Sequence, residues 1–464
     1  MSARHSQRLL DPLFTTEEMR AIFCDHGRLK GMLDFEAALA RAGSSVGLVP
    51  EGAAVAIAAQ CRAEFFDVDA LATAAALAGN LAIPLVRELT ARVAEHNIEA
   101  ARYVHWGATS QDAIDTGLVL QLRAALASID ADLARLSEAL ASLAQNHART
   151  LLAGRTWLQQ GPPVTLGLKA AGWLSAVERH RRSLAEARAQ VATLQFGGAV
   201  GTLAALDARG LEVAAALASE LKLALPDVPW HTQRDRVVAV ATTLGLLVGT
   251  LGKIARDVSL LMQTEVAEAF EPAAPGRGGS STMPHKHNPV HCAVILSAAT
   301  RVPGLVGVML AAMVQEHERG LGGWQAEWET LPEICLLAAG ALAQTTAIAG
   351  GLRVDVQMMA ANLEATRGLI MAEAVSIALA NHIGRQPAHE LVEQACAQAV
   401  RERKHLREVL AGDVRVTRHL SDAQLDRALD PEHYIGEAER LVARVLAARR
   451  VGRARGEANG DDDR

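Results

Sequence analysis

The stretch LRAALASIDADLARLSEALASL, residues 122–143, decides the fold class of this chain. Its large apolar residues recur at alternating steps of four and three positions: Leu122, Leu126, Ile129, Leu133, Leu136, Leu140 and Leu143. Such spacing lines one face of a long α-helix. The pattern recurs farther along the chain: Leu244, Leu247, Leu251, Ile254, Val258 and Leu261. Because both stripes need partners to cover them, we predict a bundle of long helices packed side by side.

The composition agrees with a helical protein. Of 464 residues, 50% are hydrophobic but only 3% are aromatic, so the apolar content is mainly Ala, Leu and Val. This favours closely packed helices over an aromatic-rich β-sandwich. The formal net charge of −6 gives no reason to expect nucleic acid or an anionic membrane as a partner.

The cysteines and the N-terminus indicate a soluble cytoplasmic protein. The five cysteines include no CxxC pair, which argues against a disulfide framework or a structural zinc site: Cys24, Cys61, Cys292, Cys335 and Cys396. The start MSARHSQRLLDPLF lacks the apolar core of a signal peptide. The longest weakly charged run, residues 237–252, is too short for a comfortable membrane span and contains Thr242 and Thr243.

The chain divides into three predicted helical domains. Residues 1–111 read as shorter helices punctuated by glycine and proline, and residues 112–352 hold the long helices. Residues 353–450 return to shorter amphipathic helices. The tail VGRARGEANGDDDR, residues 451–464, has no apolar face, so we expect it to be disordered.

Three loop-to-helix junctions stand out from the helical background. They are RYVHWGATSQDAIDT (102–116), GRTWLQQGPPVTLG (154–167) and GRGGSSTMPHKHNPVH (276–291). In the first, Thr109 or Ser110 precedes Asp112, which is typical of a helix N-cap with an acidic first turn.

The other two junctions carry similar signals. Pro162 and Pro163 suit the entry to a helix that starts at Thr165, and Asn288 with Pro289 fits an N-cap and a first helical position. For any one junction, ordinary capping is the more common meaning. Three helix N-termini gathered together, however, would direct free N–H groups toward a polyanion.

The histidines of the third junction raise a metal hypothesis. His287 and His291 are four residues apart and His285 is nearby, but no neighbouring Cys, Asp or Glu completes a ligand set. The run Gly278–Ser281 favours a mobile loop over residues 276–289 instead, because glycine lowers the cost of rearrangement.

These motifs resemble one protein family. GSSTMPHKHNP, residues 279–289, resembles the signature GSSxMPxKxNP of the fumarase/aspartase superfamily. HWGATSQD (105–112) and RTWLQQGPPVTLG (155–167) resemble its other two blocks, in the same order and at similar spacing. The resemblance implies an all-α fold of three domains whose central domain joins a twenty-helix core in a homotetramer. It also implies active sites built from three subunits, and elimination or addition β to a carboxylate without a metal or other cofactor.

The resemblance also implies roles for individual residues. Ser280 would carry the proton and His105 would act as an acid or an orienting group, although a structural role for His105 is equally consistent. Chemistry beside a carboxylate passes through an enediolate, whose extra charge needs prepositioned donors. The expected substrate-binding residues are Thr109, Ser110, Trp157, Gln159, Arg234, Ser281, Lys286 and Asn288. For Arg234, a surface charge on a helix is the alternative.

Departures from the superfamily pattern narrow the substrate class. Trp157 stands where most branches have a histidine, and an indole cannot transfer protons. The segment DPLFTTEEMRAIF, residues 11–23, lacks the Arg-Tyr pair of nucleotide-binding members, and Trp328 stands where they have an arginine. These features favour the branch that lactonises a carboxylated muconate in aromatic catabolism, where no external nucleophile needs activation. An adenylosuccinate lyase-like C–N lyase and a non-catalytic relative are the alternatives.

Overall fold

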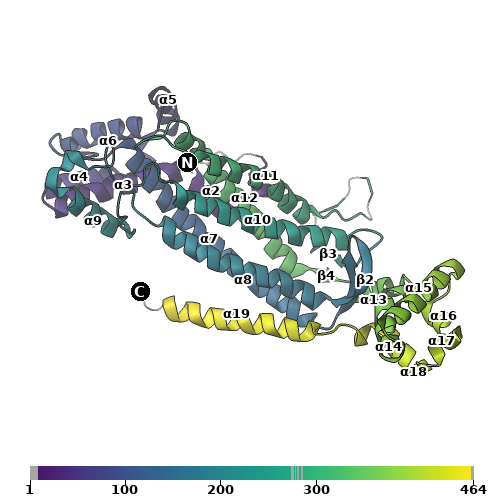
Figure 1. Cartoon of the computed structure of the whole chain (residues 1–464). Coiled ribbons are helices and arrows are strands. Elements are labelled where there is room, and N and C mark those ends of the chain that lie inside the picture. The colour runs from purple at the N-terminus through teal and green to yellow at the C-terminus, as the bar shows by residue number, and fades with distance from the viewer. Residues whose placement is uncertain (1–8, 273–275, 277, 280–281, 284–285, 461–464) are drawn as a thin grey trace. The chain divides into compact units, whose positions relative to one another are not determined.

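The structure is a computed structural model that describes residues 9–272, 276, 278–279, 282–283 and 286–460. Figure 1 shows that helices dominate the described residues, which confirms the prediction of an all-α fold. The chain forms two compact units. Unit 1 comprises Met1–Ala134, His180–Gly252 and Val294–Gln344, and unit 2 comprises Arg135–Arg179, Lys253–Ala293 and Thr345–Arg464.

Five long helices contribute to both units. They are α7 (Ser110–Asn146), α8 (Leu166–Val191), α10 (Asp235–Leu261), α11 (Val290–Ala312) and α12 (Gly323–Gly351). Both predicted leucine stripes lie on them, on α7 and α10, and every residue of the two stripes is buried. The long-helix prediction is therefore confirmed. The predicted boundary at 111/112 lies in the first turn of α7, and the one at 352/353 lies just after the end of α12. The division into three domains stays a prediction.

Unit 1 holds the short N-terminal helices. Its complete elements are α1 (Asp11–Phe14), α2 (Glu17–Phe23), α3 (Asp25–Ser45), α4 (Glu51–Gln60), α5 (Val68–Ala78), α6 (Ala82–His96) and α9 (Gly210–Leu221), with 3-10 turns at Ala63–Phe65, Ala100–Tyr103 and Ala204–Arg209. Gly31 of α3 lies against Gly117 of α7, where a Cβ on Gly31 would come within 2.7 Å of the Gly117 carbonyl oxygen. Only glycine allows this close crossing, which brings α3 against the start of α7.

Unit 2 contains the remaining elements. They are the strands β1 (Leu151–Thr156), β2 (Gln159–Thr165), β3 (Ala269–Phe270) and β4 (Arg353–Val354), and the helices α13 (Val356–Glu364), α14 (Ala372–Ile383), α15 (Arg385–Glu402), α16 (Leu406–Gly412), α17 (Val414–Thr417), α18 (Asp422–Leu429) and α19 (Ala438–Gly460), with 3-10 turns at Leu369–Met371 and Pro431–His433. The strands pair as two antiparallel ladders, β1 with β2 and β3 with β4.

The second junction differs from its prediction. Pro162 and Pro163 lie in strand β2 and not at a helix entry. A two-stranded ladder leaves one side of each strand unpaired, so it tolerates prolines that a central strand would exclude. The helix itself starts as expected: α8 begins at Leu166, and Thr165 Oγ1 accepts a hydrogen bond from Leu168 N at 3.1 Å.

Two further expectations need adjustment. Helix α19 runs to Gly460, so part of the tail predicted to be disordered is helical, and residues 461–464 lie outside the described residues. The run 237–252 belongs to a helix of 27 residues. Three described helices, α10, α11 and α12, are long and apolar enough by composition to cross a membrane. In α10 and α12 most of the apolar window is buried in the bundle, which explains that composition without a membrane.

Candidate active site

Asp112, in the first turn of α7, organises the first motif. The carboxylate is fully buried and accepts hydrogen bonds from five groups: the backbone N–H groups of Thr109, Gly197 and Gly198, Gln195 Nε2 and His231 Nε2. Because α7 begins at Ser110, Thr109 occupies the N-cap position, as predicted. The carboxylate ties the start of α7 to two segments that are distant in sequence.

Arg234 lies in a buried network and not at a surface. Its side chain is fully buried and donates to Asp115 at 2.7 Å and to Glu327 at 2.6 Å. Trp324 Nε1 and Gln111 Nε2 also donate to Asp115. Its donors point to two protein carboxylates, so the alternative of a surface charge is wrong, and a role of Arg234 in binding substrate stays a prediction.

A different arginine, Arg319, contacts the N-cap residue of α7. This half-buried residue donates from Nη1 to Thr109 Oγ1 at 3.0 Å, and its guanidinium lies 5.8 Å from the ring centre of Trp324. Burial lowers its pKa. The charges of Asp112 and Asp115 act against this lowering. In the sequence, nothing local distinguishes the arginine of EHER (316–319) from a solvated charge.

His105 pairs with a carboxylate from another helix. Its Nδ1 lies 2.6 Å from Oε1 of Glu36, a residue of α3 that is 1% exposed. His105 itself is 16% exposed and has a backbone φ of +58°, in the left-handed region. Burial alone would lower the pKa of His105, but the charges of Glu36 and Asp112 raise it above its ordinary value. Sequence reasoning missed Glu36 because it is 69 residues away.

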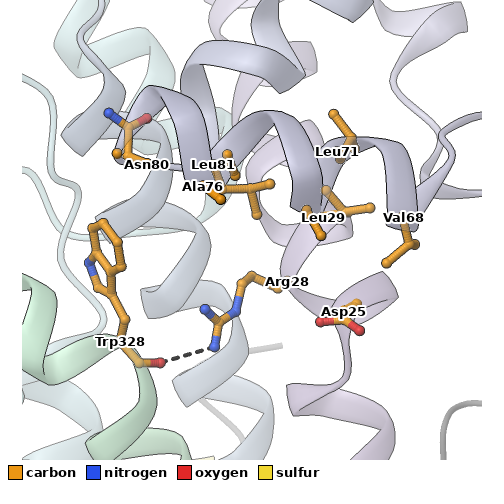
Figure 2. A pocket seen from close by; sticks show the side chains of 12 residues that line it. Asp25, Arg28, Leu29, Val68, Leu71, Ala76, Asn80, Leu81 and Trp328 are labelled. Atoms are coloured by element: carbon orange, nitrogen blue, oxygen red, sulfur yellow. Dashed lines mark hydrogen bonds between the residues drawn. The ribbon is translucent and has the colours of Figure 1, made fainter.

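Unit 1 also contains a largely apolar cavity of about 420 Å³. Figure 2 shows Trp328 at one wall, with Arg28 donating to the Trp328 carbonyl oxygen at 2.9 Å. Leu29, Leu71 and Leu81 are among the apolar lining residues. The indole of Trp328 thus borders an apolar space where nucleotide-binding relatives are expected to have an arginine.

In unit 2, the second motif forms the β1–β2 hairpin. Its tip is Trp157 and Leu158, with φ of +54° and +65° and exposures of 96% and 81%. Gln159 is also exposed. Behind the tip, Arg155 makes a bidentate contact to the buried Glu268, at 2.9 and 2.6 Å. The hairpin therefore has an anchored base and an exposed, strained apolar tip.

The third motif is described only in part. Lys286 and His287 are exposed, and Asn288 N donates to Gly278 O at 2.8 Å. Gly278 has a φ of +72°, and a Cβ there would come within 2.9 Å of the Asn288 carbonyl oxygen. Ser280, Ser281 and His285 lie outside the described residues.

A carboxylate already occupies the N-terminus of α11. The backbone N–H groups of His291 and Cys292 donate to Glu271 at 3.1 and 2.7 Å, and Glu271 is buried. Helix α11 begins at Val290, so Asn288 is one residue short of the N-cap position predicted for it. The first N–H groups of α11 are therefore not available to a substrate anion, contrary to the expectation for this junction.

The structure thus sorts the candidate residues into two groups. Unit 1 brings His105, Thr109 and Ser110 together with Arg319 around the start of α7. Unit 2 carries the second and third motifs. Within the described ranges, no three His, Cys, Asp or Glu side chains form a cluster suited to a metal ion.

Comparison with known proteins identifies the family of this chain. A family model described as lyase matches residues 14–304, and one described as adenylosuccinate lyase C-terminus matches residues 368–445. The chain belongs to the fumarase/aspartase lyase family. It is 61% identical over 447 residues to 3-carboxy-cis,cis-muconate cycloisomerase from Pseudomonas aeruginosa, covering 96% of this chain and 97% of that protein.

Solved structures and a more distant relative define the range of the family. The crystal structure of 3-carboxy-cis,cis-muconate lactonizing enzyme from Pseudomonas putida matches with a TM-score of 0.92 and 57% identity, covering 96% of this chain and all of that one. Nitrosuccinate lyase from Streptomyces davaonensis is 42% identical, with 94% of both chains covered. Membership of the family alone therefore does not fix the reaction.

Proposed function

We propose that this chain is a 3-carboxy-cis,cis-muconate cycloisomerase, which interconverts 3-carboxy-cis,cis-muconate and 4-carboxymuconolactone in protocatechuate catabolism. The observation that carries the proposal is the 61% identity over nearly the whole chain to an enzyme of that name. Trp157, in place of a histidine, supports it, because this reaction needs no side chain to activate an external nucleophile.

The reaction is an internal addition in which the substrate trianion takes up one proton. One carboxylate oxygen forms a bond to an alkene carbon, and the π electrons of that alkene move into the conjugated carboxylate as an enediolate. A proton then adds at the carbon beside that carboxylate. The enzyme must hold three carboxylates, stabilise the enediolate and deliver one proton.

The residues of unit 1 bind carboxylates of the substrate. Arg319 stands beside the N-terminus of α7, where the helix dipole and the guanidinium act together on a carboxylate. Thr109 and Ser110 supply hydroxyl groups at the same place, and Thr109 already accepts from Arg319. His105, whose raised pKa favours the imidazolium, adds a charged donor.

The residues of unit 2 complete the proposal. Ser280 delivers the proton, and Ser281 joins the substrate-binding residues. Lys286 is exposed and Asn288 is partly exposed, so both are accessible to further carboxylates. Trp157 and Gln159, at the exposed hairpin tip, border the substrate. Arg234 is not included in this set, since its donors are bound to Asp115 and Glu327.

The protein acts as a cytoplasmic homotetramer with shared active sites. Helix α11 has a strongly apolar window of which only 28% is buried, so a large apolar surface needs a partner. A second copy of the chain is the partner that the family resemblance implies, and the exposed tip at Trp157 is suited to reach it. The five cysteines are free thiols, as a reducing compartment maintains them.

A substrate comparison tests the proposal. Purified protein is incubated separately with 3-carboxy-cis,cis-muconate and with adenylosuccinate, and the ultraviolet absorbance of each is followed. Loss of the conjugated diene with the muconate alone is the expected result. Turnover of adenylosuccinate alone would identify a C–N lyase instead, and inertness toward both would support a non-catalytic relative.

A pair of loop variants tests the assignment of Ser280. Ser280→Ala is expected to lower kcat by about 10² to 10⁴, the range for removal of a proton-transfer group. Ser281→Ala, the matched change one position on, is expected to act mainly on KM. Near-normal turnover by a folded Ser280→Ala tetramer would remove Ser280 from the mechanism while leaving the substrate assignment intact.

A further inference from the structure

Building on the proposed function, we propose that Glu36 is a positioning residue that holds His105 as an imidazolium, with its Nε2–H directed to a substrate carboxylate. Glu36 belongs to none of the three sequence motifs. It lies on α3, whose close crossing with α7 at Gly31 and Gly117 brings it beside the first motif.

The contact between His105 and Glu36 is fixed by a short hydrogen bond and by the backbone of the turn that carries His105. The 2.6 Å separation between His105 Nδ1 and Glu36 Oε1 is that of a short, charge-assisted hydrogen bond. The backbone φ of +58° at His105 lies in the left-handed region, which few residues other than Gly, Asn, Asp and His adopt, and Gly107 follows at +79°. Leu206 fills the space where a Gly107 Cβ would be. The turn is thus fixed in the conformation that presents the imidazole to Glu36.

Within the described residues, Glu36 and His105 each have one polar side-chain atom without a hydrogen-bond partner. Among the described residues, Glu36 Oε2 is buried with no hydrogen-bond partner, so this carboxylate depends on His105 alone. Within the same part of the chain, no protein group bonds Nε2 of His105, whose side chain reaches the surface. One ring nitrogen is bound to the protein and the other faces outward, as a donor to a ligand requires.

The charges around His105 agree in sign. Glu36 faces it from α3 and Asp112 from the start of α7, and both carboxylates favour the protonated ring over the effect of burial. Cys61, which also faces Glu36, stays a neutral thiol because burial, and then the Glu36 charge, raise its pKa. With its pKa raised, His105 keeps its charge to a higher pH than a free imidazole and loses it as the pH rises through that value.

The positive charge of His105 stabilises the enediolate that forms during lactonisation. Negative charge grows on the conjugated carboxylate as the new C–O bond forms, and a fixed imidazolium donor stabilises this enediolate more than the ground state. A purely structural Glu36–His105 contact would hold the turn equally well with a neutral ring. The protonation state of His105 therefore separates the two roles.

The test is a titration of His105 in the full-length protein with ¹³C-labelled histidine, assigned by comparison with His105→Gln. In the wild type, His105 is expected to titrate above the ordinary imidazole value, and in Glu36→Gln at or below it. In the same variant the alkaline limb of kcat/KM is expected to move to lower pH, with activity at pH 8 falling by on the order of tenfold. Glu36→Asp is expected to restore part of the His105 titration shift and part of the activity at pH 8.

The matched control is Asp34→Asn, the same loss of charge on α3 at a partly exposed residue bound to Lys30. Asp34→Asn is expected to leave the His105 titration and the pH dependence of kcat/KM unchanged. An unaltered His105 titration in Glu36→Gln, or lost activity without any shift in pH, would overturn the proposal. If Glu36→Gln does not fold, a wild-type His105 that titrates at or below the ordinary value overturns it. The titration needs no substrate, so its result is independent of whether the proposed reaction is correct.

Discussion

At the N-terminus of α7 the buried carboxylate Asp112 is accompanied by a cation, Arg319, whereas at the N-terminus of α11 the buried carboxylate Glu271 accepts directly from the helix N–H groups. Both helix ends belong to motifs that, in the sequence, indicated anion binding. At α11 the Glu271 carboxylate already accepts two N–H groups, so the positive end of the helix is compensated within the protein. At α7, Asp112 accepts from the N-cap N–H of Thr109, but Arg319 adds positive charge at the same place. The arrangement at α7 is therefore better suited to an external anion than the one at α11.

The two regions also differ in how firmly their side chains are held. Around α7, Asp112 and Arg234 are buried and fully engaged with other protein groups. Around α11, Lys286 is exposed and the described backbone bonds are local. A helix N-terminus is therefore evidence of an anion-binding site only when the charged groups beside it do not already compensate its positive end.

The largest expected effect comes from breaking the network below the α7 site. Replacement Arg234→Met leaves Asp115 and Glu327 buried without their counter-ion, and we expect the free energy of unfolding to fall by about 3–5 kcal/mol. Urea denaturation measures the change. The matched control is Arg182→Met, at an exposed position on α8, which is expected to stay within about 0.5 kcal/mol of wild type. A small loss for Arg234→Met would show that the network is not needed for the fold.

The second prediction separates binding from stability at Arg319. Replacement Arg319→Gln keeps a hydrogen-bond donor for Thr109 but removes the charge beside α7. We expect kcat/KM to fall about 100-fold, with the unfolding free energy changed by less than about 0.5 kcal/mol. Arg319→Lys, which keeps the charge and loses the planar fork, should recover part of the activity. Equal activity in all three proteins would contradict the contrast between the two helix ends.

The smallest effect is expected at the compensated helix end. Replacement Glu271→Ala removes the acceptor for His291 N and Cys292 N, and we expect a loss of about 1–2 kcal/mol in unfolding free energy. Thermal denaturation of this variant and of Glu265→Ala, at an exposed position nearby, measures the difference. A Glu271→Ala protein as stable as its control would mean that α11 does not rely on this carboxylate.

The sequence was sufficient for the fold because the signal is periodic and local. The stripe that begins at Leu122 repeats over many turns, and α7 and α10 follow it closely. The hairpin at the second motif was missed because its tip, Trp157–Leu158, lacks the Asn or Gly expected where φ is positive.

The candidate site was predictable only in part, for a physical reason. Motif spacing marks residues that are adjacent in the chain, whereas Glu36, Glu271 and Arg319 act through contacts made by folding. Arg234 shows a further effect of packing that motif spacing does not reveal: its donors are directed toward Asp115 and Glu327. A charge in a motif can bind substrate or fix the framework, and the partners decide which.

The proposed reaction is tested most directly by proton NMR of the product formed from 3-carboxy-cis,cis-muconate in D₂O. Protonation of an enediolate by an exchangeable group places one deuterium on the carbon beside the carboxylate. We expect 4-carboxymuconolactone with a single solvent-derived deuterium at that carbon. Absence of the lactone, or a lactone without deuterium there, would contradict the proposed reaction.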